Sequence, residues 1–273
     1  MPGKKIKKKV NVLIMTGYGL NCEEETGIAF EYCGAKSEKL HLNDILEKEN
    51  ILERFHIFAF IGGFSFGDHL GAGTVLANRL KFRIQKQIIK FINEGKLIIG
   101  ICNGFQTMTR LGLLPALGKK YFEQQAALIH NDSGLFRDDW VFMKGNQNSP
   151  CVFTKDIVSI KMPVRHGEGK FVAEPAIISE IMQKNLYCLQ YCDEALDTNA
   201  AFPYNPNGSI NNIAGICDET GRIFGLMPHP EAFLSPYNEP DWIRKKLSGI
   251  IKKEGDGIKI FANAVNYAKE NLF

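Results

Sequence analysis

The sequence predicts an α/β fold built on a mostly parallel central sheet, with helices on both faces and additional antiparallel strands in the second half. Two observations predict the parallel part: nearly continuous apolar segments recur through the first half, and amphipathic segments of helical period separate them. Strands that are apolar on both faces belong to a sheet that helices cover from both sides. The third observation is that β-rich segments follow one another in the second half, where some of them must pair antiparallel.

The elements of the first half can be placed in chain order. We expect strands at residues 9–15, 39–42, 56–61 and 96–101. Helices are expected at residues 22–34, from 43 onward and at 75–93. Three acidic residues, Glu23 to Glu25, stand in the first turn of the helix at 22–34, where negative charge suits the positive end of the helix dipole.

The second half is expected to hold further strands and a helical end. The strands are predicted at residues 127–130, 140–143, 158–162, 186–191, 210–217 and 222–226. No internal repeat or low-complexity linker divides the 273 residues, so we predict a single domain over residues 1–273. Residues 1–8 are expected to form a basic tail, and residues 234–273 a charged, helical C-terminal extension that packs on the domain.

Composition and charge exclude several classes of protein. Hydrophobic residues make up 45% of the chain and charged residues 23%, which is ordinary for a globular protein. The formal net charge is +3, and a lysine run within residues 4–9, which we interpret as a solvated tail, supplies part of it. No apolar stretch approaches the ~20 residues of a membrane helix, and the start lacks the apolar core of a signal peptide. We therefore expect a cytoplasmic protein with no nucleic-acid or membrane partner.

The seven cysteines are scattered through the chain. They stand at positions 22, 33, 102, 151, 188, 192 and 217. Because they lack the paired short spacings of a zinc site, the sequence predicts no metal centre. Cys188 and Cys192 are close enough in sequence to suggest ligands, but the predicted strand beside them makes buried free thiols the simpler interpretation.

The strongest local signal for chemistry is the segment GICNGFQ at residues 100–106, between a predicted strand and a predicted helix. It is typical of a nucleophile elbow, in which a strained turn projects the nucleophile, here Cys102, at the carboxyl edge of the sheet. Gly100 and Gly104 supply the space that such a turn needs. The start of the following helix favours a thiolate and can stabilise an oxyanion. From this segment alone, an ordinary buried cysteine in a strand-to-helix turn stays an open alternative.

The second signal is MPHPE at residues 227–231, directly after a predicted strand. Pro230 favours an extended conformation for His229, in which side chains two residues apart point the same way. His229 and Glu231 can therefore lie side by side, as a base and the carboxylate that orients it. A histidine before proline is by itself usually a turn residue, but the Cys102 elbow favours the catalytic interpretation.

The third signal is GGFSFGD at residues 62–68, where a buried strand reaches its carboxyl end. Ligands bind at that edge of open α/β sheets. The backbone amide of Gly63 or Phe64 could join that of Asn103 in an oxyanion hole. A glycine-rich phosphate loop is the rival interpretation, but the phosphate-loop motif G-x-x-x-x-G-K-[ST] is missing.

Several segments together resemble the class I, triad-type glutamine amidotransferases. Within that family the match goes further, to the small glutaminase subunits of phosphoribosylformylglycinamidine synthases, from purine biosynthesis. The motifs that carry the resemblance span residues 10 to 233: GLNCE (19–23), GGFSFGD (62–68), CNGFQ (102–106), GLLP (112–115), HGEG (166–169), NPNGS (205–209) and GLMPHPE (225–231). The Cys and His motifs are shared with other amidotransferases, whereas GGFSFGD, HGEG and NPNGS are more specific to these subunits.

The resemblance implies a flavodoxin-like class I glutamine amidotransferase fold. It also implies that Gln106 helps to hold the glutamine substrate and that the HGEG loop, with His166 and Gly167, borders the site. The sequence departs from the family pattern at the lysine-rich leader, at Phe66 and His69 where tyrosines are expected, and in an added C-terminal stretch. None of these departures touches the Cys and His motifs.

The resemblance further implies a catalytic triad of Cys102, His229 and Glu231. We expect His229 to deprotonate Cys102, whose thiolate attacks the side-chain carbonyl of glutamine, while the oxyanion donors stabilise the charge. Protonated His229 then releases ammonia, and water hydrolyses the glutamyl thioester intermediate to glutamate. By resemblance, the ammonia passes to a larger, ATP- and Mg-using synthetase subunit, often accompanied by a small third subunit. No cofactor is expected in this chain.

Two other functions stay open. One is a hydrolase or chaperone of the same sandwich architecture whose elbow also carries a cysteine, although its acid and base would be placed differently from the P-H-P-E segment. The other is a catalytically silent regulatory subunit that binds glutamine. A complete set of Cys102, His229 and Glu231 argues against a silent subunit, which would be free to lose one of them.

Overall fold

A nine-stranded sheet forms the centre of the computed structural model, which describes residues 9–273, so the predicted basic tail at 1–8 lies outside the described residues. The sheet order is β2 (Lys36–His41), β1 (Asn11–Thr16), β3 (Ile57–Phe60), β4 (Leu97–Ile101), β11 (Ile223–Leu226), β10 (Ile213–Cys217), β9 (Tyr187–Cys192), β6 (Arg137–Gly145) and β7 (Ser159–His166). The strands from β2 to β11 are parallel, and those from β10 to β7 continue the sheet antiparallel. The predicted mixed sheet is confirmed.

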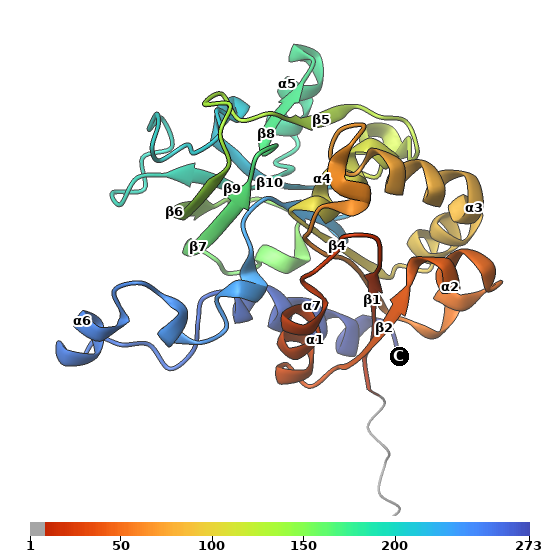
Figure 1. Cartoon of the computed structure of the whole chain (residues 1–273), viewed down its shortest axis with the longest axis horizontal. Helices are drawn as coiled ribbons and strands as arrows, with labels where there is room; N and C mark the ends of the chain where they lie inside the picture. The colour runs from red at the N-terminus through yellow and green to blue at the C-terminus, as the bar shows by residue number, and fades with distance from the viewer. Residues whose placement is uncertain (1–8) are drawn as a thin grey trace, which may run out of the picture.

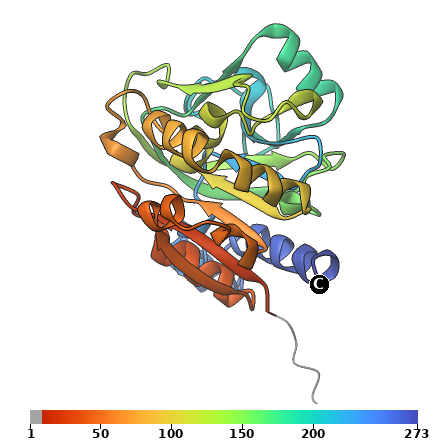
Figure 2. The ribbon, with the colours of Figure 1, turned by 90° about the vertical axis from the view of Figure 1, so that its right-hand side faces the viewer.

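Helices cover both faces of the parallel strands (Figures 1 and 2). The helices are α1 (Glu23–Tyr32), α2 (Leu42–Glu47), α3 (Thr74–Asn93), α4 (Asn103–Leu111), α5 (Pro175–Gln183), α6 (Trp242–Leu247) and α7 (Ile258–Asn271). α1 and α7 lie together on one face, where the rings of Phe30 and Phe261 meet edge to face at 4.9 Å, and α3 and α4 lie on the other face. Every residue of β3 and β4 between these layers is buried, as the apolar pattern predicts.

The C-terminal extension has two parts that differ in packing. α7 packs beside α1, so this part covers the sheet. α6 buries none of its residues and stands away from the sheet, and its Leu247 is 84% exposed. With three basic residues in six, α6 lacks the apolar stripe that would hold it against the core. The assignment of all 273 residues to one domain stays a prediction.

Two elements and several boundaries differ from the sequence prediction; β6 and β7, for example, extend beyond the predicted residues 140–143 and 158–162. β8 (Lys170–Ala173), which pairs antiparallel with β5 (Ala126–Ile129) in a small separate sheet, was not predicted, and neither was α5. A proline in the first turn of α5 is a helix-start signal that could have shown it. The strand predicted at 210–217 begins with a 3-10 turn, because Asn211 and Asn212 have positive φ angles of 51° and 55°.

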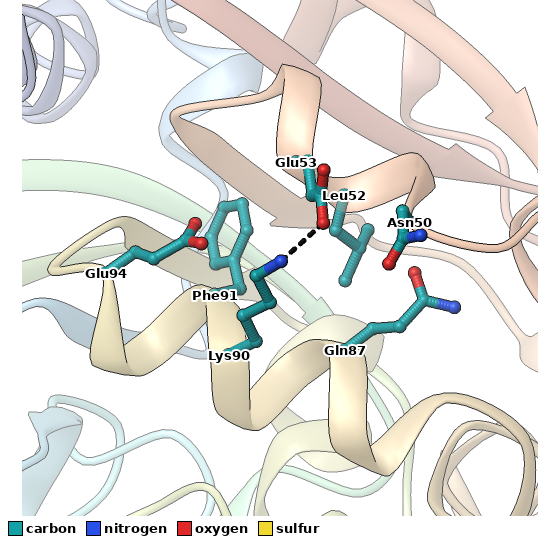
Figure 3. A pocket seen from close by; sticks show the side chains of 7 residues that line it. All are labelled: Asn50, Leu52, Glu53, Gln87, Lys90, Phe91 and Glu94. Carbon is teal, nitrogen blue, oxygen red and sulfur yellow. Dashed lines mark hydrogen bonds and ion pairs between the residues drawn. The ribbon is translucent and has the colours of Figure 1, made fainter.

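A small hollow lies where the turn η1 (Ile51–Arg54) meets the second half of α3 (Figure 3). Lys90 of α3 forms an ion pair with Glu53 of η1 across it, at 2.5 Å, and Phe91 and Leu52 line it. Its volume of about 10 Å³ has room for about one water molecule. The hollow is therefore a packing feature and not a substrate site. Among residues 9–273, no helix is both long and apolar enough to cross a membrane.

We expect Gly104→Ala to destabilise the fold, because Gly104 brings α4 against the backbone of β3. A Cβ at Gly104 would lie 2.0 Å from the carbonyl oxygen of Phe60, and a strand buried on both sides cannot move away. We expect a loss of about 3 kcal/mol in the free energy of unfolding, at the upper end of the usual cost of overpacking a core. Urea denaturation measures it.

Gly134→Ala is the matched control for this measurement. A Cβ there meets nothing within 4 Å, and only the positive φ of 66° opposes the change. We expect a cost of about 1 kcal/mol. Equal losses in the two variants would show that the contact of Gly104 with Phe60 does not limit the packing of α4.

Candidate active site

Cys102 occupies a strained turn between β4 and α4. Its φ of 51° and ψ of −105° lie outside the ordinary regions for a residue with a side chain. Gly100 and Gly104 make this turn possible, since a Cβ at Gly100 would lie 2.4 Å from the sulfur of Met108. The predicted elbow geometry is present, and the first amides of α4, which have no partner within the helix, begin at Asn103.

Parallel pairing of β11 with β4 brings the second half of the chain to Cys102. Leu226 at the end of β11 is the register partner of Ile101 at the end of β4, so the segments that follow leave the sheet at the same edge. His229 is then held in place by its backbone amide, which donates to the carbonyl of Pro163 in β7 at 2.9 Å. From this position the His229 imidazole interacts with the Cys102 thiol, which itself donates to the carbonyl of Arg165 at 3.6 Å.

His229 and Glu231 form a buried pair, with Nδ1 and Oε1 2.5 Å apart. The sequence predicts both residues in one extended segment, which is only half correct. His229 is extended, whereas Glu231 lies in the 3-10 turn η6 (Pro230–Ala232), because Pro230 favours the first position of a helical turn. The turn still carries the carboxylate to the imidazole, so the predicted pairing of the two side chains is seen.

The charges around His229 favour its protonated form. Burial disfavours the charged ring, but the Glu231 carboxylate and the Cys102 thiol outweigh burial and raise the pKa of His229 well above its ordinary value. Within the described residues, Nε2 of His229 and Oε2 of Glu231 make no hydrogen bond of normal geometry. The imidazole can therefore accept the thiol proton of Cys102 and hold it as an imidazolium beside a thiolate.

A second thiol, that of Cys22, also lies against His229. The ligating atoms of Cys22, His229 and Glu231 lie within 4.8 Å of one another, and a Cβ at Gly62 would come within 3.0 Å of both the Cys22 sulfur and the imidazole. Burial raises the pKa of Cys22, and Cys22 does not line the cavity that Cys102 lines. The position beside the cavity therefore favours Cys102 over Cys22 as the candidate nucleophile. The sequence alone predicts no role for Cys22, although this residue lies within the GLNCE motif.

A cavity of about 150 Å³ opens beside Cys102. Its lining includes predicted site residues from both halves of the chain: Gly63, Phe64, Cys102, Gln106, His166 and Gly167. The other three predicted residues, Asn103, His229 and Glu231, are buried and do not line it. The fold thus brings the predicted residues to one edge of the sheet around a space of small-molecule size.

Charged residues that the sequence analysis missed also line this cavity. They are Asp68, Arg165 and Glu168. Burial and the nearby Glu168 carboxylate raise the pKa of Asp68 to about 6. Asp68 belongs to GGFSFGD and Glu168 to HGEG, so the two motifs held the signal, but only the fold shows that the carboxylates face the same space.

The Gln106 side chain is bound by the protein at both ends. Its Nε2 donates to the carbonyl of Glu168 at 2.5 Å, and its Oε1 accepts from Nδ2 of Asn103 at 3.0 Å. Asn103 Nδ2 also donates to Oδ1 of Asp68 at 3.2 Å. These bonds tie the start of α4 to the HGEG loop and to the GGFSFGD turn.

The HGEG and NPNGS motifs meet in a buried polar cluster around His166. Nδ1 of His166 lies 3.1 Å from Oδ1 of Asn131, and Nε2 lies 3.5 Å from Nδ2 of Asn207, which donates to the Gly169 carbonyl at 2.9 Å. Burial, together with the nearby His229, lowers the pKa of His166 to about 3, so its ring stays neutral. His166 therefore helps to fix the loop that forms one wall of the cavity.

Comparisons with known proteins identify the family of this chain. The family described as the CobB/CobQ-like glutamine amidotransferase domain matches residues 9–268. The chain is 44% identical over 271 residues to the phosphoribosylformylglycinamidine synthase subunit PurQ of Methanococcus maripaludis, covering 96% of this chain and 98% of that protein. The chain belongs to the PurQ family of glutamine amidotransferases.

Two further comparisons support membership of the PurQ family. The PurQ subunit of Dehalococcoides mccartyi is 44% identical over 262 residues, which cover 96% of this chain and 99% of that protein. The solved structure of PurLQS from Thermotoga maritima contains a chain with a TM-score of 0.70 and 29% identity, over 95% of this chain and 99% of that chain. The predicted class I glutamine amidotransferase fold is thereby confirmed.

We expect Glu231→Gln to lower the pKa of His229 by at least ~1 unit, because the variant removes a contacting negative charge. The chemical shift of the His229 ring protons, followed against pH by NMR, measures the change. The neutral His166 ring serves as an internal reference above pH ~5, since its pKa is about 3.

The matched control is Glu239→Gln. Glu239 is also buried and ion-paired, but its partners are Lys161 and Lys245 and not His229. We expect the pKa of His229 to stay unchanged in this variant. If Glu231→Gln also left the pKa of His229 unchanged, Glu231 would not be the group that raises this pKa.

Proposed function

We propose that this chain is the glutaminase subunit of a phosphoribosylformylglycinamidine synthase, which hydrolyses glutamine to glutamate and supplies ammonia for de novo purine biosynthesis. The observation that carries the proposal is the contact of the strained Cys102 elbow with the buried His229–Glu231 pair beside a cavity. The named PurQ relatives, which match nearly the whole chain, support the choice of synthase.

The first half of the proposed reaction forms a thioester. His229 takes the proton of Cys102, and the thiolate attacks the side-chain carbonyl carbon of glutamine, whose π electrons move to the oxygen. When the oxyanion collapses, the carbon–nitrogen bond breaks and the nitrogen takes the proton of His229 and leaves as ammonia. Glu231 keeps the imidazole oriented and stabilises its positive charge.

The second half of the reaction regenerates the enzyme. His229, now neutral, takes a proton from water as the water attacks the thioester carbonyl. Collapse of this second tetrahedral intermediate breaks the carbon–sulfur bond, so that glutamate leaves and Cys102 returns as a thiolate beside the imidazolium. Both halves use the same base and the same oxyanion donors.

The amides of Gly63 and Asn103 are the proposed oxyanion donors. The sequence left the first donor open between Gly63 and Phe64, but the Phe64 amide already donates to the carbonyl of Gly19 at 2.8 Å. Gly63 is preferred for that reason, and it lines the cavity beside Cys102. The Asn103 amide lies at the start of α4, where the helix dipole adds to the stabilisation of negative charge.

The charges of the cavity suit the two ends of an amino acid. We assign the carboxylates of Asp68 and Glu168 to the α-ammonium group of glutamine and the Arg165 guanidinium to its α-carboxylate. The predicted substrate residues Gln106, His166 and Gly167 line the same cavity.

The proposed partner is the large synthetase subunit of the same synthase. The solved PurLQS structure, which contains a chain similar to this one, supports an assembly of this kind, with a small third subunit. We assign the use of ATP and Mg²⁺ to the synthetase subunit, which converts formylglycinamide ribonucleotide to the amidine with the ammonia delivered by this chain. A cytoplasmic location stays a prediction from the sequence.

We expect Cys102→Ala to abolish glutamine-dependent synthesis by the assembled complex, because no thioester can form. Ammonia-dependent synthesis should persist at the wild-type rate, since the synthetase then receives its nitrogen from solution. Assays of the amidine product with glutamine or with ammonium salts measure the two activities. Cys33→Ala, half-buried and outside the cavity, is the control and should retain both.

The two activities also separate the alternatives. A silent glutamine-binding subunit would leave glutamine-dependent synthesis intact in Cys102→Ala. Equal loss of both activities would mean that Cys102 supports the complex in some way other than glutamine hydrolysis. An unrelated Cys hydrolase would show no effect on the synthase at all.

We expect the KM for glutamine to rise several-fold as the pH falls from about 7 to about 5. Asp68, whose pKa is raised to about 6, is charged above that pH and neutral below it, so its attraction for the α-ammonium group is lost on acidification. Steady-state kinetics of the assembled complex measure KM separately from kcat.

Two variants check that Asp68 is the source of this pH dependence. Asp68→Asn should have a high KM already at pH 7, with little further change down to pH 5. Asp132→Asn removes an exposed carboxylate that pairs with Lys170 outside the cavity, and it should keep the wild-type profile. If the KM of Asp68→Asn rose as much as that of the wild type between pH 7 and pH 5, this role for Asp68 would be excluded.

A further inference from the structure

Three buried cysteines from separate parts of the chain meet at one point in the antiparallel half of the sheet. Cys151 precedes the turn η4 (Val152–Thr154), Cys188 lies in β9 and Cys217 ends β10. Their sulfur atoms all lie within 4.8 Å of one another, and the three residues are at most 3% exposed. None of them lines the cavity at Cys102, so the cluster is separate from the proposed active site.

The backbone holds two of these thiols on neighbouring strands. The register of β9 against β10 shifts between the pairs Gly215 with Leu189 and Ile216 with Tyr187, which leaves Cys188 as the extra residue of a bulge. The amide of Cys217 donates to the carbonyl of Leu186 at 2.9 Å.

The loop at residues 146–151, which is hydrogen-bonded at both ends, holds the Cys151 thiol over β9 and β10. The amide of Asn146 donates to the Cys188 carbonyl at 3.0 Å, and the amide of Val152 donates to the Gly221 carbonyl at 3.0 Å. Gly221 allows this approach, since a Cβ there would lie 2.0 Å from the carbonyl oxygen of Pro150. The loop is therefore bound at both ends, and the three sulfurs are placed before any ligand arrives.

A hydroxyl completes a possible set of four ligands. Ser149 Oγ lies 3.6 Å from the sulfur of Cys188 and 3.8 Å from that of Cys217. In a tetrahedral zinc site with Zn–S bonds of about 2.3 Å and a Zn–O bond of about 2.0 Å, the oxygen and a sulfur lie about 3.5 Å apart. The distances at Ser149 are close to that value, and soft thiolates are the ligands that select zinc.

The cluster also has an access route. Cys151 and Ser149 line a hollow of about 630 Å³ between the loop and α7, so an ion from solution can reach them.

We propose that Cys151, Cys188 and Cys217, with Ser149 as the fourth ligand, bind one Zn²⁺ ion. The ion links the loop at residues 146–151 to β9 and β10, and its role is structural because all four positions are filled by the protein. The cysteine spacings in the sequence predict no metal centre, whereas strand pairing brings these ligands together from distant positions.

The test measures zinc bound to the full-length chain. The reduced protein is stripped with EDTA, incubated with excess Zn²⁺ and desalted, and the metal is measured by inductively coupled plasma mass spectrometry. We expect one zinc per chain, and with Co²⁺ in its place the strong thiolate charge-transfer absorption of a tetrahedral site. No bound metal above trace level would overturn the proposal.

Variants locate the ion. Cys151→Ser and Cys217→Ser should each lose the bound zinc, with circular dichroism to verify folding, and Cys151, in a loop, is the variant expected to fold most readily. Cys192→Ser is the matched control, because Cys192 is equally buried in β9 but outside the cluster, and it should retain one zinc. Ser149→Ala should weaken zinc binding at least about tenfold in competition with a chromophoric chelator.

A second group of potential ligands must be distinguished from this one. Cys22, His229 and Glu231 also place their ligating atoms within 4.8 Å of one another. The proposed site predicts that Cys22→Ala keeps one zinc per chain. Zinc that disappears in Cys22→Ala and persists in Cys151→Ser would place the ion at the catalytic residues and overturn the proposal.

Discussion

The left-handed turn at Cys102 is the constraint on which the rest of the active site depends. A side chain in that conformation is strained, and the turn persists because glycines on both sides allow α4 to lie directly against β3 and β4. The turn aims the sulfur out of the sheet at the edge where the parallel strands end. Every other group of the site is placed relative to that sulfur, by strand pairing or by loops fastened to the same edge.

The buried His229–Glu231 pair is the second constraint, and it shows how the protein supports charge away from water. An unpaired buried charge is costly, but here the imidazolium lies between a carboxylate and a thiol that both favour it. Neutral His166, held by Asn131 and Asn207, stands nearby without adding a competing positive charge. The site therefore concentrates charge on the reacting groups and keeps the supporting residues neutral.

Hydrophobic periodicity predicted most of the helices and strands, because the formation of each element depends mainly on residues that are close in sequence. The apolar run at residues 56–61 and the amphipathic period at 75–93 correspond closely to β3 and α3. The small sheet of β5 and β8 was only half predicted, since β8 is a four-residue strand whose stability comes from pairing with a segment about 40 residues earlier. The predicted start of β10 was wrong, because the left-handed conformations of Asn211 and Asn212 are set by their tertiary surroundings.

By itself, the sequence determined the parallel sheet, the elbow at Cys102 and the pairing of His229 with Glu231, because apolar periodicity, glycine spacing and the effect of a proline on its neighbours act over short distances. The tertiary structure decided which groups meet across the chain. In the folded chain, Cys22 lies against the His229 imidazole, and Asp68 and Glu168 line one cavity. The Phe64 amide is hydrogen-bonded to the Gly19 carbonyl, and the thiols of Cys151, Cys188 and Cys217 lie close together. These contacts depend on strand register and loop closure, which bring together residues from distant segments, so no single short stretch of sequence specifies them.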